Sequence, residues 1–205
     1  MFAVVESGSI TSMPKGNKGV KIGDYNYPPA AFTLWSEAER NAVGIYTVEI
    51  DETNKKNSEW YMNTNITYAF GSGKVTGTYG TATAKAHADS TYTNDDKTNN
   101  LIPTGKDVGD VKKEGLKTVL IRGLKKQVEG ILNQTDWYIT RKAEKTTAIP
   151  SAITTHRDAV RTKQASMETA ITNAADTPAL ETLYTYTKQE DGSITRPLGE
   201  LPTLS

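Results

Sequence analysis

The sequence contains no cysteine, and only two histidines and three tryptophans occur among its 205 residues. The lack of cysteine excludes disulfide bonds, thiolate nucleophiles and cysteine-ligated zinc. Hydrophobic residues make up 36% of the chain, which is below the roughly 45–50% apolar share of ordinary globular proteins. A chain with so little apolar material has limited means to build a core of its own. We therefore expect contacts with other subunits to contribute to its stability.

The sequence also lacks a net charge and a long apolar run. Lysine and arginine number 24, and aspartate and glutamate also number 24. Because no overall positive field attracts phosphate backbones, we expect no nucleic-acid partner. No window approaches the ~18 apolar residues of a membrane span, and the first residues lack the basic and apolar pattern of a signal peptide. We expect a soluble protein without membrane insertion.

Residues 1–84 are predicted to form a β-rich domain with one short helix. Ser36 and Glu39 have the spacing of a capping box, which predicts that a helix begins after Ser36. Gly44 can adopt the left-handed conformation that ends a helix. This helix spans only about two turns and is too short to be stable alone. Leu34, Trp35 and Val43 are therefore predicted to anchor it to the rest of the domain.

Apolar and polar residues alternate between Glu59 and Phe70, which predicts a half-buried strand with Trp60 as a packing anchor. The sequence at 71–73, Gly-Ser-Gly, predicts a hairpin turn. The return strand at 74–83 is interrupted by Gly77 and Gly80, and we expect a weak, bulged edge strand that is open to docking or intermolecular pairing.

Residues 85–109 are predicted to be a polar linker, residues 110–184 a two-helix hairpin, and residues 185–205 a turn and an extended tail. Apolar residues repeat at spacings of three and four in both helices, which is typical of packed helices. The seam can join the two helices of one chain, join different chains, or do both. Trp137, in the connection between the helices, is expected to pack on them. The candidate assembly residues are Ile121, Leu124, Val128, Ile131, Ile153, Val160 and Met167, and the candidate packing anchors are Trp35, Trp60 and Trp137.

No constellation of residues predicts a catalytic, cofactor or metal site. His87 and His156 have no partner at the spacing of a known motif. The pair at 95–96, Asp-Asp, lacks the alternating oxygen ligands of a calcium loop. The segment at 71–77 has the wrong spacing for a phosphate-binding loop. The fold expected from these patterns is α+β, with a small N-terminal antiparallel β region with one short helix, followed by a C-terminal two-helix hairpin.

Two segments of the helical half resemble small tail proteins of tailed bacteriophages, especially those of marine phages. In these proteins one helix ends in Thr-Asp-Trp, and a second carries an aromatic residue followed by Arg-x-Ala-Leu/Val-Arg. Here the corresponding residues are 135–137 and 156–161, with His156 in place of the aromatic residue. Residues 26–28, 35–40 and 43–46 also look like the β-rich head of such proteins.

The resemblance implies a non-enzymatic structural component of a phage tail, namely a fibre, baseplate or tail-tip protein that self-associates and docks to other tail proteins. We expect a homo-oligomer, with a trimer as one option, that is made in the host cytoplasm and located in the tail of the virion, without a cofactor. A tail-fibre assembly chaperone that is absent from the mature virion is the alternative. A glycan hydrolase, the third class, needs two carboxylates held at ~5–10 Å, and the sequence nominates no such pair.

Overall fold

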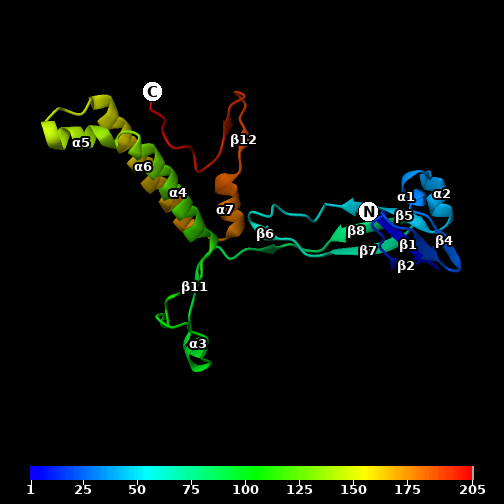
Figure 1. Ribbon diagram of the computed structural model, residues 1–205. Helices are drawn as coiled ribbons and strands as arrows, with labels where there is room; N and C mark the ends of the chain where they lie inside the picture. The colour runs from blue at the N-terminus through cyan, green and yellow to red at the C-terminus, as the bar shows by residue number, and fades with distance from the viewer. Residues whose placement is uncertain (205) are drawn as a thin grey trace. The chain divides into compact units, whose positions relative to one another are not determined.

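The computed structural model describes residues 1–204 and confirms a mixed α+β composition, with β-sheets in the N-terminal part and helices in the C-terminal part (Figure 1). The chain divides into two compact units, Met1–Thr83 and Ala84–Ser205. Within residues 1–204, no helix combines the length and the apolar character needed to cross a bilayer.

The first unit contains a five-stranded sheet in the order β2-β1-β5-β8-β7, and two short helices. Strands β2 and β7 stand at the two ends of this order, yet they lie close to each other, so the sheet curls. The elements are β1 (Phe2–Glu6), β2 (Ser9–Ser12), β3 (Val20–Ile22), β4 (Tyr25–Tyr27), α1 (Ala30–Thr33), α2 (Glu37–Ala42), β5 (Ile45–Asp51), β6 (Tyr61–Met62), β7 (Ile66–Gly71) and β8 (Lys74–Tyr79), with β9 (Thr83–Ala84) pairing with β6 at the boundary of the unit.

The β7–β8 hairpin forms as predicted, but β8 is an internal strand and not a weak edge. It pairs with β7 in an antiparallel manner and with β5 in a parallel manner, so the sheet is mixed where an antiparallel one was predicted. Gly77 makes this position possible: a Cβ atom there would lie 2.8 Å from both Ile66 and Tyr68. The glycine that suggested a weak strand instead allows close packing of its neighbours.

Two hydrophobic clusters lie on opposite faces of this sheet. Successive residues of a strand point to opposite faces. In β1, Ala3 and Val5 belong to one cluster and Phe2 packs in the other. We call the first the strand-side cluster (Ala3, Val5, Val48, Val75) and the second the helix-side cluster (Ala31, Phe32, Ile45).

Helix α2 begins as the capping box predicts. Ser36 Oγ accepts a hydrogen bond from the Glu39 amide, and the Glu39 carboxylate accepts one from the Ser36 amide at 2.8 Å. Gly44 follows with a φ of 84°. Trp35 is half-buried and meets Tyr27 edge to face at 5.9 Å. Leu34, however, is 80% exposed, which contradicts its predicted role as an anchor, because the α1–α2 turn directs it away from the helix-side cluster.

The second unit has four helices of eight residues or more where two were predicted, and its first long helix begins at Leu116 rather than Asp110. The connection at 134–149 contains a helix of its own because Thr135 and Asp136 start a new turn after α4 ends. The helices are α4 (Leu116–Asn133), α5 (Asp136–Lys145), α6 (Ser151–Asn173) and α7 (Thr177–Tyr184), and the short elements are β10 (Ser90–Thr91), α3 (Asn94–Thr98), β11 (Val111–Lys113), β12 (Thr187–Lys188) and β13 (Ile194–Thr195).

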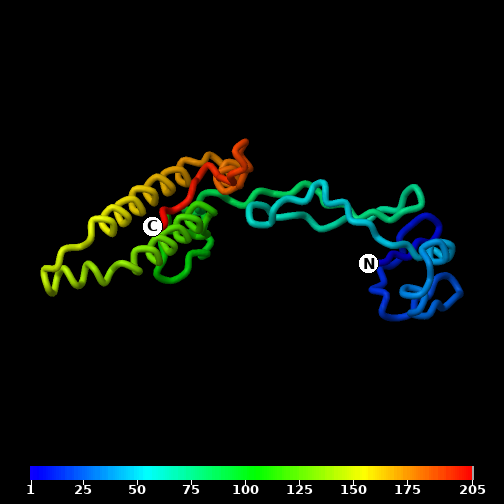
Figure 2. The backbone as a smooth tube through the Cα atoms, turned by 90° about the horizontal axis from the view of Figure 1, so that it is seen from above, coloured from blue at the N-terminus to red at the C-terminus, as the bar shows by residue number. Residues whose placement is uncertain are grey.

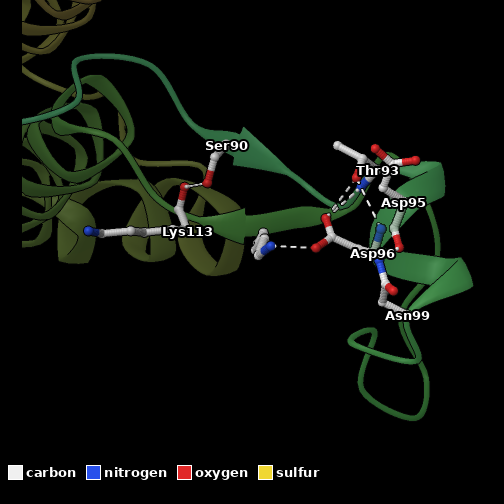
Figure 3. A network of polar contacts seen from close by, with 7 residues as sticks. Ser90, Thr93, Asp95, Asp96, Asn99 and Lys113 are labelled. Atoms are coloured by element: carbon white, nitrogen blue, oxygen red, sulfur yellow. Dashed lines mark hydrogen bonds and ion pairs between the residues drawn. The ribbon is translucent and has the colours of Figure 1, made fainter.

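The segment predicted to be a polar linker, residues 85–109, instead contains β10 and α3, and it is closed by the pairing of β10 with β11. Figure 3 shows the polar network that holds it: Thr93 caps α3, and Asp96 accepts hydrogen bonds from Thr93. Lys112 forms an ion pair with Asp96 at 2.6 Å. Because polar side chains satisfy the backbone of this segment, it acquires order with few apolar residues.

The C-terminal segment turns at Asp191-Gly192-Ser193, as predicted, between β12 and β13. Beyond β13 it is anchored to the second unit by Leu198, which is 3% exposed and whose amide donates to the Leu183 carbonyl. The tail is therefore an extended segment packed on the helices of its own chain.

Candidate functional site

Helices α4 and α6 pack side by side and antiparallel (Figures 1 and 2). Contacts at both ends fix the direction: Lys117 Nζ donates to the Thr172 carbonyl at 2.7 Å, and Arg157 Nη1 donates to the Leu132 carbonyl at 2.8 Å. Most of the candidate assembly residues lie in this intramolecular contact. Leu124, Val128, Ile153, Val160 and Met167 are each 7% exposed or less, and Ile121 and Ile131 are half-buried.

The apolar seam joins the two helices of one chain, which is one of the arrangements that its spacing left open. Leu124 and Val128 are already covered within the chain, so they are not available to a second chain unless the helices separate. The most exposed apolar residue of α4 is Val119, at 48%. A docking surface must therefore be sought elsewhere in this unit.

A buried arginine joins the two segments that carry the resemblance to phage tail proteins. The side chain of Arg157 in α6 is 9% exposed, and its Nη1 atom lies 2.6 Å from Thr135 Oγ1 and 2.8 Å from Asp136 Oδ1. The same atom donates to the Leu132 carbonyl. A guanidinium at this point satisfies a carbonyl at the end of α4 and fixes the start of α5. The segments at 135–137 and 156–161 are therefore neighbours in space.

Helix α5 carries an aromatic and cationic cluster next to this arginine. Trp137 and Tyr138 have ring centroids 3.9 Å apart, and the Arg141 guanidinium lies 4.7 Å from the first ring and 5.2 Å from the second. Arg141 lies four residues after Trp137 and three after Tyr138, the helical spacings that bring it close to both rings. Arg141 Nε is buried and has no hydrogen-bond partner among residues 1–204, so the cation is held mainly by the two rings.

Two large apolar side chains of α5 are accessible to solvent. Trp137 is 52% exposed and Ile139 is 43% exposed, so Trp137 is not the internal packing anchor that the sequence predicted. Its neighbours in α5 are too few to cover an indole, since the helix is short and follows the end of α4 directly. By contrast, Trp60 in the first unit is buried, and Trp35 is half-buried. We call Trp137, Tyr138 and Arg141, together with Arg157, the α5 corner.

The α5 corner has the composition of a protein-binding hot spot. Tryptophan, tyrosine and arginine are the residues that most often dominate interface energetics, and a rigid arrangement reduces the entropy lost on binding. The buried role of Arg157 was not predicted from the sequence, because a single arginine beside an apolar seam is usually a solvent-facing residue. Its one signal was its place inside the segment that resembles phage tail proteins.

The remaining titratable residues serve local structure. The Lys112 ammonium and the Thr93 backbone amide lower the pKa of Asp96 from 3.8 to about 2. Asp89 accepts hydrogen bonds from the Gly115 amide and the Thr118 hydroxyl at the start of α4. These hydrogen bonds lower the pKa of Asp89. His156 is buried and His87 is half-buried. Within the part of the chain that the structure describes, no three histidine, aspartate or glutamate side chains are grouped to hold a metal ion.

Comparison with models of protein families, with curated proteins and with solved structures finds no match for this chain. The arguments for function therefore come from the residues themselves and from the segments at 135–137 and 156–161.

Proposed function

We propose that this chain is a non-enzymatic structural component of a bacteriophage tail, in a fibre, a baseplate or a tail tip, and that it works by self-association and by docking to other tail proteins. The observation that supports this proposal is the α5 corner. Two of its residues, Trp137 and Arg157, belong to the two segments that resemble small phage tail proteins. It presents an exposed tryptophan beside an arginine that lies over its ring.

The contacts at the α5 corner favour a rigid docking element. Arg157 ties the end of α4 to the start of α5 through three acceptors, each within 2.8 Å of one guanidinium nitrogen. A partner that covers Trp137 would thus bind a preorganised surface, which reduces the entropy lost on binding.

The alternative is a tail-fibre assembly chaperone, which would use the same corner transiently. Quantitative mass spectrometry of purified virions of a phage that encodes this chain distinguishes the two roles. A structural component gives peptides in a fixed ratio to other tail proteins, whereas a chaperone is found in infected cells and is depleted from virions. Absence from both virions and assembly intermediates would refute both roles.

A further inference from the structure

An apolar cavity of about 380 Å³ opens on the surface of the first unit. Met1, Met13, Pro14, Lys15 and Tyr68 line it. Met13 and Tyr68 also pack against the strand-side cluster, so the floor of the cavity is continuous with the hydrophobic core. Methionine side chains adapt readily to an inserted apolar group. This cavity can therefore accept an apolar side chain at little cost in rearrangement.

The same unit presents an exposed apolar side chain on its surface. Leu34 is 80% exposed although its neighbour Phe32 is buried and Trp35 is half-buried. The turn that carries it is rigid: the Leu34 amide donates to the Ala30 carbonyl at 2.8 Å, and Arg40 donates to the Trp35 carbonyl at 2.6 Å. Leu34 is thus held away from the core by the backbone on both sides.

The surroundings of Leu34 and of the cavity are complementary in charge. Glu37 lies three residues after Leu34, in the first turn of α2, and its carboxylate is not the one that forms the capping box. Lys15 lines the cavity. Neither Lys15 nor Glu37 forms a salt bridge within residues 1–204, and both are exposed. An apolar contact bordered by one pair of opposite charges has the composition of a specific interface.

Leu34 and the cavity lie on opposite sides of the sheet. Leu34 belongs to the turn between the helices that cover the helix-side cluster, whereas Met13 and Tyr68 pack on the strand-side cluster. Leu34 therefore cannot fill the cavity of its own chain without unfolding the sheet. A contact between two different patches of identical chains is heterologous, and it repeats to form a ring or a filament.

We propose that Leu34 of one copy of this chain inserts into the cavity formed by Met1, Met13, Pro14, Lys15 and Tyr68 of the next copy, with Glu37 facing Lys15. This inference rests on the self-association in the proposed function and names the surface that mediates it. The resulting head-to-tail contact has the repeating symmetry that a tail assembly requires.

The experiment is sedimentation velocity of the full chain from micromolar to near-millimolar concentration, with four variants. Leu34→Asp is expected to weaken the association at least about tenfold, because it places a carboxylate in an apolar cavity. Tyr25→Asp is the matched control: Tyr25 is 73% exposed in the same unit but lies in the β4 strand, outside the proposed contact. It is expected to associate like the wild type.

Charge reversal tests the pairing of the two patches. Lys15→Glu alone is expected to weaken association several-fold, and combining it with Glu37→Lys is expected to restore the association to within about twofold of the wild type. Far-UV circular dichroism checks that each variant is folded. Full association of Leu34→Asp, failure of the reversed pair to restore association, or a wild-type chain that remains monomeric throughout would each overturn the inference. The virion mass spectrometry described above tests the proposed function separately, since a tail protein can assemble through another surface.

Discussion

Removing the buried guanidinium of Arg157 is expected to destabilise the helical part of the second unit. Arg157→Ala deletes contacts to the Leu132 carbonyl, the Thr135 hydroxyl and the Asp136 carboxylate. Thr135 is 3% exposed; its hydroxyl keeps the Leu132 carbonyl as its acceptor but loses the guanidinium as a donor, where water has little access. Asp136 is 51% exposed and can return to solvent, which limits the penalty for its charge. Hydrogen bonds to charged groups contribute about 1.5–3 kcal/mol each, and a buried partner left unsatisfied costs about 1–3 kcal/mol.

These contributions share one nitrogen atom and do not add fully. The net expectation is a loss of about 2–4 kcal/mol in the free energy of unfolding. Urea denaturation followed by far-UV circular dichroism measures this loss, because most of the helical residues belong to α4, α5 and α6. At a dependence of ~2 kcal/mol per molar urea, which is typical of small proteins, the midpoint should fall by about 1–2 M.

Arg161 provides the matched control on the same helix. It lies one turn after Arg157 and pairs with Asp158 at 3.5 Å, but the two side chains are 52% and 69% exposed. Arg161→Ala should therefore change the stability by less than about 0.5 kcal/mol. If Arg157→Ala were as mild as Arg161→Ala, the corner would not depend on the buried guanidinium, and the structural argument for a rigid α5 would be wrong.

Three further predictions concern other parts of the chain. Trp137→Ala should cost only about 1–2 kcal/mol, since the indole is half-exposed but contacts Tyr138 and Arg141. It should nevertheless abolish binding to the tail partner in calorimetry, and unchanged binding would exclude the α5 corner as the docking surface. The depressed pKa of Asp96 stabilises the fold above pH 3.8, and this contribution is lost as the pH falls towards about 2. Above pH 3.8, pepsin should therefore cleave residues 90–113 of the wild type more slowly than those of Asp96→Asn, and this difference should disappear towards pH 2. Ser36→Ala should cost about 1 kcal/mol in thermal unfolding by removing the cap of α2, and no loss would contradict the role of the capping box.

Local sequence signals determined the elements that depend only on near neighbours. The capping box of Ser36 and Glu39, the stop at Gly44 and the hairpin turn at 71–73 all form as predicted, because each depends on hydrogen bonds or backbone angles within a few residues. The α+β composition follows from the change of apolar period between the two parts of the chain. These features depend on local interactions and not on contacts between distant segments.

Contacts between distant segments determined the strand pairing of the sheet and the structure of residues 85–109. From the sequence, Gly77 indicated a weak strand. Because β8 pairs in parallel with β5, Gly77 instead lies in an internal strand where its neighbours pack closely. The salt bridge between Asp96 and Lys112 gave order to a segment that composition alone marks as a linker.

The predicted assembly residues and the α5 corner also differ in whether local spacing or tertiary contacts determine them. Spacing identified Leu124 and Val128 as members of an apolar seam, but it could not say whether the seam is covered by the same chain or by another. The return of α6 along α4 covers them and brings Arg157 to Thr135, across a separation of 22 residues. Amphipathic spacing specifies which face of a helix avoids water, whereas only tertiary packing determines what covers that face and which side chains remain free to bind a partner.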